Sequence, residues 1–323
     1  MLQEQFSQAI EAAGMTAPDF IHADGTLHRF SPTGRSSDAA GWYVLYADGV
    51  PAGVFGCWRT GLVQTWCAKA NNAMTPAERE AMRQRVRQAK AQRDAEHQQR
   101  QLMAQGAAQA RWAAASPLLT DVLAHPYLSA KGVQGFGLRL EGVLPAAPGL
   151  SPGLRGAGLL LVPMRDAAGT LHSLQTIAPD GSKRFLAGGR VHGCYCAMGQ
   201  VGTVLVIAEG FATAASIHMA TGLAVATAFS ASNVAPVARA LRQKYPGLPL
   251  VLAADDDYAT EGNPGLTVAR QAALAVGGTV VMPQFPAHRA GATDFNDLHR
   301  LAGPDAVRTC FAEVLEEFPH ANH

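Results

Sequence analysis

Two different rhythms of apolar and polar positions divide the chain. In residues 20–70, aromatic and β-branched runs are separated by Asp-Gly and other glycine-containing turns, a pattern typical of antiparallel strands. From residue 201 onward, short apolar runs such as VLVIA and PLVLAA alternate with helical segments, which predicts a parallel sheet with helices on both faces. We expect these helices at residues 211–221, 234–244, 264–276 and 304–317.

A long polar helix is expected between these two regions. Thr75 and Glu78 can cap each other's backbone amides, and Pro76 suits the first helical position. No further proline occurs before Pro117, so the pattern predicts about 40 residues of helix, which is roughly 60 Å. Residues 78–111 hold eight Lys or Arg against four acids. This positive charge suits either a solvated connecting helix or an arm that follows a phosphate backbone.

Composition and turns indicate a multidomain globular chain. We divide its 323 residues into a small β-rich domain (1–72), a basic connecting helix (73–116), an α+β subdomain (117–200) and an α/β domain (201–323). The N-terminus lacks a secretory pattern, and no apolar run approaches the ~20 residues that span a bilayer. We therefore expect a cytoplasmic protein without a membrane partner.

Aromatic and cysteine residues favour core packing over chemistry. Five large rings in the β-rich region could fill its core or stack unpaired bases, and we favour the core because the domain is small: Trp42, Tyr43, Phe55, Trp58 and Trp66. Five scattered cysteines indicate no disulfide framework. Cys194 and Cys196 share one face of an expected strand, where core packing is favoured over a metal pair.

Acidic residues follow the ends of three expected strands. They are Glu209 after VLVIA, Asp255, Asp256 and Asp257 after PLVLAA, and Asp294 and Asp297 after TVVMP. Because ligands of open α/β sheets bind at the carboxyl edge of the strands, we expect these acids to converge there. In extended chain, Asp255 and Asp257 share a side and can bind one cation, while Asp256 points elsewhere. Such crowding favours Mg²⁺, although any single acid could instead cap a helix.

The residues after Glu209 are suited to phosphate. Gly210 allows close approach of a backbone or a phosphate, and the expected helix from Phe211 has free amide groups that attract anions. One or two magnesium ions at this edge can activate an attacking hydroxyl and stabilise a leaving phosphate. The sequence therefore predicts phosphoryl or nucleotidyl transfer, or the reverse reaction, hydrolysis.

These motifs resemble a known family. The E-G of AEGFATAAS and the D-x-D of AADDD, on this sheet order, are similar to the Toprim domain of primases, topoisomerases and some nucleases. HPYLSAKGV, LLVPMRDAAGTLHSLQ, GSKRFLAGG and TDFNDL resemble primases carried by plasmids, prophages and integrated conjugative elements, across residues 118–303. The resemblance implies a Rossmann-like Toprim domain at the C-terminus, preceded by an α+β primase subdomain and a small β-rich domain.

The resemblance also implies roles for single residues. Glu209, Asp255 and Asp257 would be catalytic and bind Mg²⁺ or Mn²⁺, with Asp294 and Asp297 as supporting metal ligands, and Lys183, Arg184, Gly210 and Thr213 would contact nucleic acid or NTP. Two departures from the family stand out. Thr213 replaces a further acid found in many Toprim proteins, and Cys57 and Cys67 cannot build the zinc ribbon with which replicative primases usually begin.

The favoured hypothesis is a DNA primase that makes short RNA primers on single-stranded DNA, for replication of a mobile element. Its partners would be the template, NTPs and a replicative helicase encoded elsewhere, because the chain lacks a P-loop motif. One alternative is a Toprim-type nuclease that keeps the metal site. Another is a non-catalytic accessory protein that binds single strands through the Arg-rich helix. The GSKRF segment favours the primase, since a simple nuclease does not need it.

Overall fold

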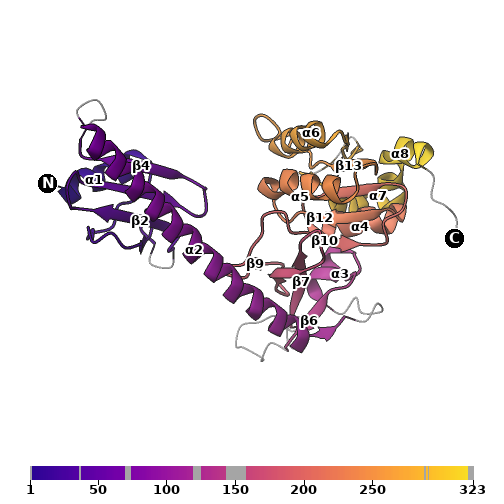
Figure 1. Ribbon diagram of the computed structural model, residues 1–323. Coiled ribbons are helices and arrows are strands. Elements are labelled where there is room, and N and C mark those ends of the chain that lie inside the picture. The colour runs from indigo at the N-terminus through magenta and orange to yellow at the C-terminus, as the bar shows by residue number, and fades with distance from the viewer. Residues whose placement is uncertain are drawn as a thin grey trace. The chain divides into compact units, whose positions relative to one another are not determined.

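The protein forms two compact units, Met1–Gln99 and Arg100–His323, which are described separately (Figure 1). The structure, a computed structural model, describes residues 2–35, 38–69, 74–118, 125–142, 158–286, 289 and 291–318. Across these ranges no helix is long and apolar enough to cross a membrane. The finer division into four parts stays a prediction.

The first unit is built on an antiparallel sheet. Its strands follow chain order: β1 His28–Phe30, β2 Gly41–Tyr46, β3 Ala52–Cys57 and β4 Val63–Cys67. Helix α1, Leu2–Ala12, buries Phe6 against one face, where its ring meets the rings of Tyr43 and Phe55 edge-on. The alternation of apolar residues along β2 and β3 therefore produces two apolar faces, and α1 covers one of them.

Helix α2, Pro76–Ala114, covers the other face with its first part. Ala89 is buried there against Trp42, and the guanidinium of Arg93 lies over the rings of Trp42 and Trp58. Trp42, Tyr43 and Phe55 are each at most 2% exposed, which confirms that these rings fill the core. They are not available to stack bases.

The long helix itself is confirmed, with 39 residues. It starts with the expected capping box: the amide of Thr75 donates to Glu78 Oε2 (2.6 Å), and the amide of Glu78 donates to Thr75 Oγ1 (3.3 Å). Arg85 donates to the Val50 carbonyl oxygen, and Arg111 forms two hydrogen bonds to Glu141. These arginines have partners within the protein, which favours a connecting role at their positions. A phosphate-binding arm stays a prediction.

The second unit begins with another antiparallel sheet. Its strands lie in the order β5 Ser116–Pro117, β6 Arg139–Glu141, β7 Leu159–Arg165, β8 Leu171–Ile177 and β9 Lys183–Phe185. Short helix α3, Pro126–Lys131, packs Leu128 into the core that this sheet shares with the next one. The last part of α2 buries Ala108 against Leu161 and Leu174, and Ala115, the residue after the helix, is buried in the same cluster.

The predicted parallel sheet comes next along the chain. Its order is β10 Cys196–Met198, β12 Ala224–Thr227, β11 Leu205–Ala208, β13 Leu250–Ala253 and β14 Thr279–Val281. Strand β10 pairs antiparallel with β12, whereas the other pairs are parallel. The sequence analysis expected a strand at Cys194 and Cys196 but not its antiparallel place in this sheet, because that place depends on pairing with β12.

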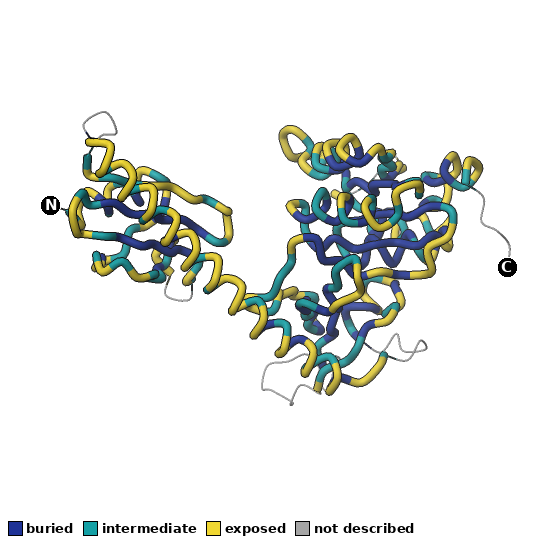
Figure 2. Tube along the Cα trace, viewed as in Figure 1, coloured by how far each residue is buried: buried dark blue, intermediate teal, exposed yellow. Residues whose placement is uncertain are grey.

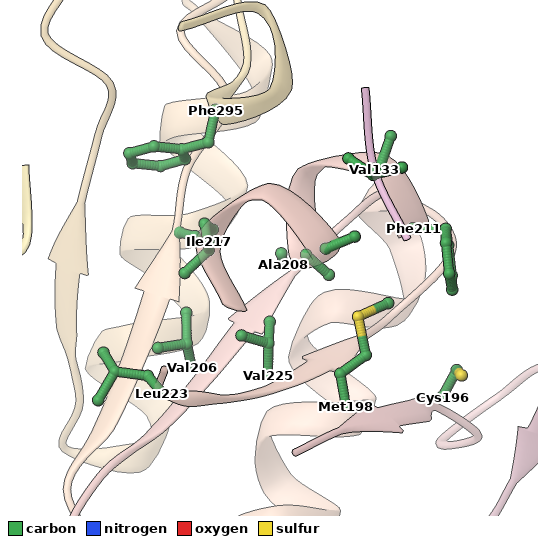
Figure 3. Close-up of a cluster of buried hydrophobic side chains, with 14 of the residues drawn as sticks. Val133, Cys196, Met198, Val206, Ala208, Phe211, Ile217, Leu223, Val225 and Phe295 are labelled. Carbon is green, nitrogen blue, oxygen red and sulfur yellow. The ribbon is translucent and has the colours of Figure 1, made fainter. Parts of the chain in front are cut away.

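Both faces of this sheet are buried (Figure 2). Val206, Ala208 and Val225 point into the core shared with α4 and α7, as Figure 3 shows. The alternate residues Leu205 and Ile207 point into a second core on the opposite face. Cys194 and Cys196 lie in the first core, which confirms the packing interpretation for this pair.

The helices around the sheet are α4 Phe211–Thr221, α5 Ala231–Lys244, α6 Pro264–Val276, α7 Phe295–Cys310 and α8 Ala312–Glu317. Helices α4 and α6 have the expected bounds. The expected helix at residues 304–317 is confirmed as the second stretch of α7 together with α8, but α7 already starts at Phe295. A kink at Gly303 (φ 81°), followed by Pro304, separates two helical stretches and hid the first one from the sequence pattern.

Candidate metal and nucleotide site

The acids expected to converge lie at the carboxyl edge of the parallel sheet. Glu209 follows β11, Asp255 and Asp257 follow β13, and Asp294 and Asp297 stand at the start of α7. Burial, together with the negative charges of the other four acids, raises the pKa of Asp255 to about 8. The negative charges of all four other acids therefore disfavour the ionised form of Asp255.

Asp255 also has an unsatisfied oxygen. Its Oδ1 is buried and has no hydrogen-bond partner within the described part of the chain. Burying an unpaired carboxylate oxygen is costly, and a nearby cation would remove that cost. The pKa of Glu209 is also raised. Burial and the charge of Asp257 raise the pKa of Glu209, while the amide of Ala231 and the ammonium of Lys183 oppose that shift.

Asp294 and Asp297 also cap helix α7. The amide of Asp297 donates to Asp294 Oδ1 (2.8 Å), and the amide of Thr293 donates to Asp297 Oδ2 (3.0 Å). The other oxygen of Asp294 accepts a hydrogen bond from Thr213 Oγ1 (3.1 Å). Thr213, at the position where many Toprim proteins have an acid, thus ties the start of α4 to the start of α7.

Asp256 points away from the other acids, as its place in the sequence predicted. Its Oδ1 accepts from Asn263 Nδ2 (2.7 Å), and its Oδ2 accepts from Arg289. Asp257 belongs to the acid group and also has a backbone partner, because its Oδ2 accepts from the amide of Gly265 (3.0 Å). A Cβ at Gly265 would stand 2.7 Å from the Asp255 carbonyl oxygen, so glycine is required for this approach. Asn263 and Gly265 carry no sequence signal of their own.

The donor chemistry of the site suits Mg²⁺ or Mn²⁺. All five side chains offer hard carboxylate oxygens, which these ions prefer, and Asp255 Oδ1 has no other partner among the described residues. In the described ranges, no three His, Cys, Asp or Glu side chains are gathered around one metal position.

One cationic side chain, Lys183, faces these acids. The ammonium of Lys183 lies 5.6 Å from the centre of the Tyr127 ring. The crowding of protein groups around this ammonium and the charge of Lys131 lower its pKa, whereas Asp294 and Glu209 raise it. Tyr127 was missed by the sequence analysis. Its hydroxyl is buried and has no partner among the described groups, and burial followed by the charge of Asp294 raises its pKa to about 12.

Lys183 and Arg184 differ in orientation. In β9, Lys183 is paired with Ile177, which is buried in the core, and Arg184 is paired with Thr176. Paired residues of antiparallel strands point to the same face, and neighbours along a strand point to opposite faces. Lys183 thus lies on the face that packs toward the acids, and Arg184 lies on the opposite face.

Comparisons with known proteins agree with this architecture. Residues 204–305, which contain the acidic edge, match the Toprim domain family. Over 296 residues the chain is 36% identical to a DNA primase TraC of Escherichia coli, and over 298 residues it is 33% identical to a second one. Each match covers 88% of this chain. The chain is therefore similar to the TraC primases, but it spans only 26% of one and 20% of the other.

Two solved structures show a more distant similarity. The DnaG primase catalytic domain bound to single-stranded DNA has a TM-score of 0.45 and 14% identity, covering 68% of this chain and 80% of that chain. The RNA polymerase domain of Mycobacterium tuberculosis primase DnaG has a TM-score of 0.43 and 18% identity, covering 66% of this chain and 83% of that chain.

Proposed function

We propose that this chain acts as a DNA primase, which joins ribonucleotides from NTPs on a single-stranded DNA template. The observation that carries the proposal is the buried oxygen of Asp255, which has no partner among the described residues; the charges of four further carboxylates act on Asp255, and the Lys183 ammonium faces the acids. A site of this charge pattern is suited to divalent cations and polyphosphate. The similarity to the TraC primases supports the reaction. A role in the replication of a mobile element is a further part of the proposal.

Glu209, Asp255 and Asp257 are the proposed catalytic metal ligands, with Asp294 and Asp297 supporting them. When bound, Mg²⁺ or Mn²⁺ would supply the positive charge that nucleotidyl transfer needs at the attacking hydroxyl and the leaving phosphate. Thr213 holds Asp294 through its hydroxyl and so keeps one carboxylate oriented. The two cap hydrogen bonds fix Asp294 and Asp297 relative to α7.

Other residues of this edge would bind the phosphates. Lys183 is the proposed cationic contact to the triphosphate or the nucleic-acid backbone, because it lies on the face toward the acids. Gly210 has no side chain to obstruct a phosphate approaching the start of α4. Thr213 lies in the first turn of that helix. Arg184, on the opposite face of β9, would contact the nucleic acid only outside the acidic edge.

Two alternatives keep the same residues but differ in reaction. A Toprim-type nuclease would cleave a phosphodiester with the same acids. A non-catalytic accessory protein would bind single strands without turnover. Lys183 and the similarity to the TraC primases favour the primase. That similarity extends well beyond the residues that match the Toprim family. The proposed setting is the cytoplasm, with a helicase encoded elsewhere as a further partner.

The test is incubation of the protein with single-stranded DNA, labelled NTPs and Mg²⁺ or Mn²⁺. Wild-type protein should make short oligoribonucleotides, and Glu209→Gln and Asp257→Asn should make none while remaining folded. Asp305→Asn is a matched control, because Asp305 is an exposed acid elsewhere on α7. Cleavage of the DNA, lost in the same two variants, would select the nuclease. Unchanged DNA binding in all variants, with no turnover, would select the accessory protein.

A further inference from the structure

An exposed aromatic ring stands beside the acidic edge. Phe185, the last residue of β9, is 42% exposed, although a large apolar side chain normally gains by burial. Strand β9 ends the strand order of its sheet, and β8 is its one neighbour among the described strands. The Phe185 ring meets the Phe229 ring edge-on, with centroids 6.3 Å apart and an interplanar angle of 80°. Phe185 is thus supported on one side and open on another.

Strand alternation places this ring next to Lys183. The two residues are two positions apart, so their side chains point to the same face of β9. That face packs toward the acids, because the Lys183 ammonium lies near enough to Asp294 and Glu209 for their charges to raise its pKa. One face of the strand therefore presents a cation followed by an open aromatic ring.

Phe229 fixes the position of the Phe185 ring relative to Glu209. It follows β12 with a φ of 73°, a left-handed conformation that is a genuine outlier for a bulky residue. In this conformation its amide donates to the Glu209 carbonyl oxygen over 2.7 Å. Its ring is only 8% exposed. Strained backbone of this kind persists where the surrounding structure holds it, often at functional sites.

We propose that Phe185 is a stacking platform for one unpaired nucleobase, held beside the acidic edge while Lys183 contacts the neighbouring phosphate. Aromatic rings bind bases without regard to sequence because every base has a flat π-face. The inference rests on the proposed function, since it assumes nucleic acid or nucleotide at this edge. The base could belong to the DNA strand or to the incoming nucleotide, and the experiment separates these two sources.

The test compares wild-type protein with Phe185→Leu, Phe185→Ala and Phe185→Trp. Affinity for a short single-stranded oligonucleotide is measured by fluorescence anisotropy, and KM for NTP is measured separately. Phe185→Leu and Phe185→Ala should either lower the affinity for the oligonucleotide or raise KM for NTP, by roughly 10-fold. Phe185→Trp should keep the wild-type value, because stacking needs an aromatic ring. Phe20→Ala serves as a matched control, since Phe20 is an exposed ring (66%) of the other unit.

An oligonucleotide series with one abasic site moved along the strand supplies a readout that a structural role would not affect. If the strand provides the base, one abasic position should abolish the difference between wild-type protein and Phe185→Leu. If the incoming nucleotide provides it, KM should rise in Phe185→Leu with DNA affinity unchanged. Full affinity and unchanged KM in Phe185→Leu would overturn the proposal, as would a loss that Phe185→Trp does not restore.

The binding measurement needs no turnover, so it separates the two claims. Aromatic-dependent and base-dependent binding by a protein that makes no primers would refute the primase and keep the stacking platform. Normal primer synthesis and normal binding by Phe185→Leu would refute only the platform.

Discussion

Asp255→Asn should make the metal-free protein more stable, by an amount that increases between pH 5 and pH 7. The pKa of Asp255 is about 8 in the folded protein, against an ordinary value of 3.8. The folded state therefore keeps a proton that the unfolded chain has already lost. As a consequence, wild-type stability decreases as the pH rises from about 4 to about 8. Asparagine keeps the shape of the side chain and has no such dependence.

The size of the effect can be worked out from these two pKa values. Each pH unit above 3.8, up to about 8, costs the folded wild-type protein about 1.4 kcal/mol. The penalty removed by asparagine has an upper bound of roughly 4 kcal/mol at pH 7 and below 2 kcal/mol at pH 5. Solvent reaches part of the side chain and screens the repulsion, so we expect about half of these values.

The assay is hydrogen exchange of peptides covering β13, across a urea series in EDTA, which reports on the unit that contains the site. Saturating Mn²⁺ should stabilise the wild-type protein by ligand linkage and have little effect on Asp255→Asn. Asp256→Asn is the informative neighbour, because it disturbs the pairing with Arg289 and should destabilise the protein. A destabilised Asp255→Asn variant, or a gain that is equal at both pH values, would refute the reasoning.

Three further predictions concern contacts elsewhere. Lys183→Ala should reduce primer synthesis at least 10-fold, and Arg184→Ala should stay within about twofold of wild type, because the two side chains lie on opposite faces of β9. Equal losses in the primer assay would contradict that assignment. Thr213→Val removes the donor to Asp294 Oδ2 and should weaken Mn²⁺ binding about 10-fold in a calorimetric titration, whereas Thr213→Ser should not. Thr75→Ala breaks the capping box of α2 and should cost about 1 kcal/mol in urea unfolding followed by tryptophan fluorescence, and an unchanged midpoint would show that the cap contributes nothing.

The sequence predicted the elements whose signals are local. Helices α4 and α6 and the start of α2 were located by apolar periodicity, capping residues and glycines, all of which act within a few positions. The start of α7 was missed because the glycine and proline at its kink resemble a helix boundary. Strand β10 was missed as a member of the parallel sheet because its place depends on pairing with β12.

The site was predictable to the same extent. Strands of one parallel sheet end at one edge, so the acids after β11 and β13 could be expected to meet without a structure. Contacts created by the packing of the two sheets could not be expected. The approach of Lys183 to the acids, the buried hydroxyl of Tyr127 and the pairing of Phe185 with Phe229 all join residues distant in sequence. The double role of Asp294, as helix cap and member of the acid group, emerges only from its hydrogen bonds.

The central claim is that the acids around Asp255 support template-directed nucleotidyl transfer. The most direct measurement is incorporation of labelled NTPs on single-stranded DNA by wild-type protein, Asp255→Asn and Asp305→Asn, each in Mg²⁺ and in Mn²⁺. We predict short oligoribonucleotides from wild-type protein and Asp305→Asn, and none from Asp255→Asn. Products made equally by Asp255→Asn would contradict the claim, as would the absence of product from a wild-type protein that still binds the template.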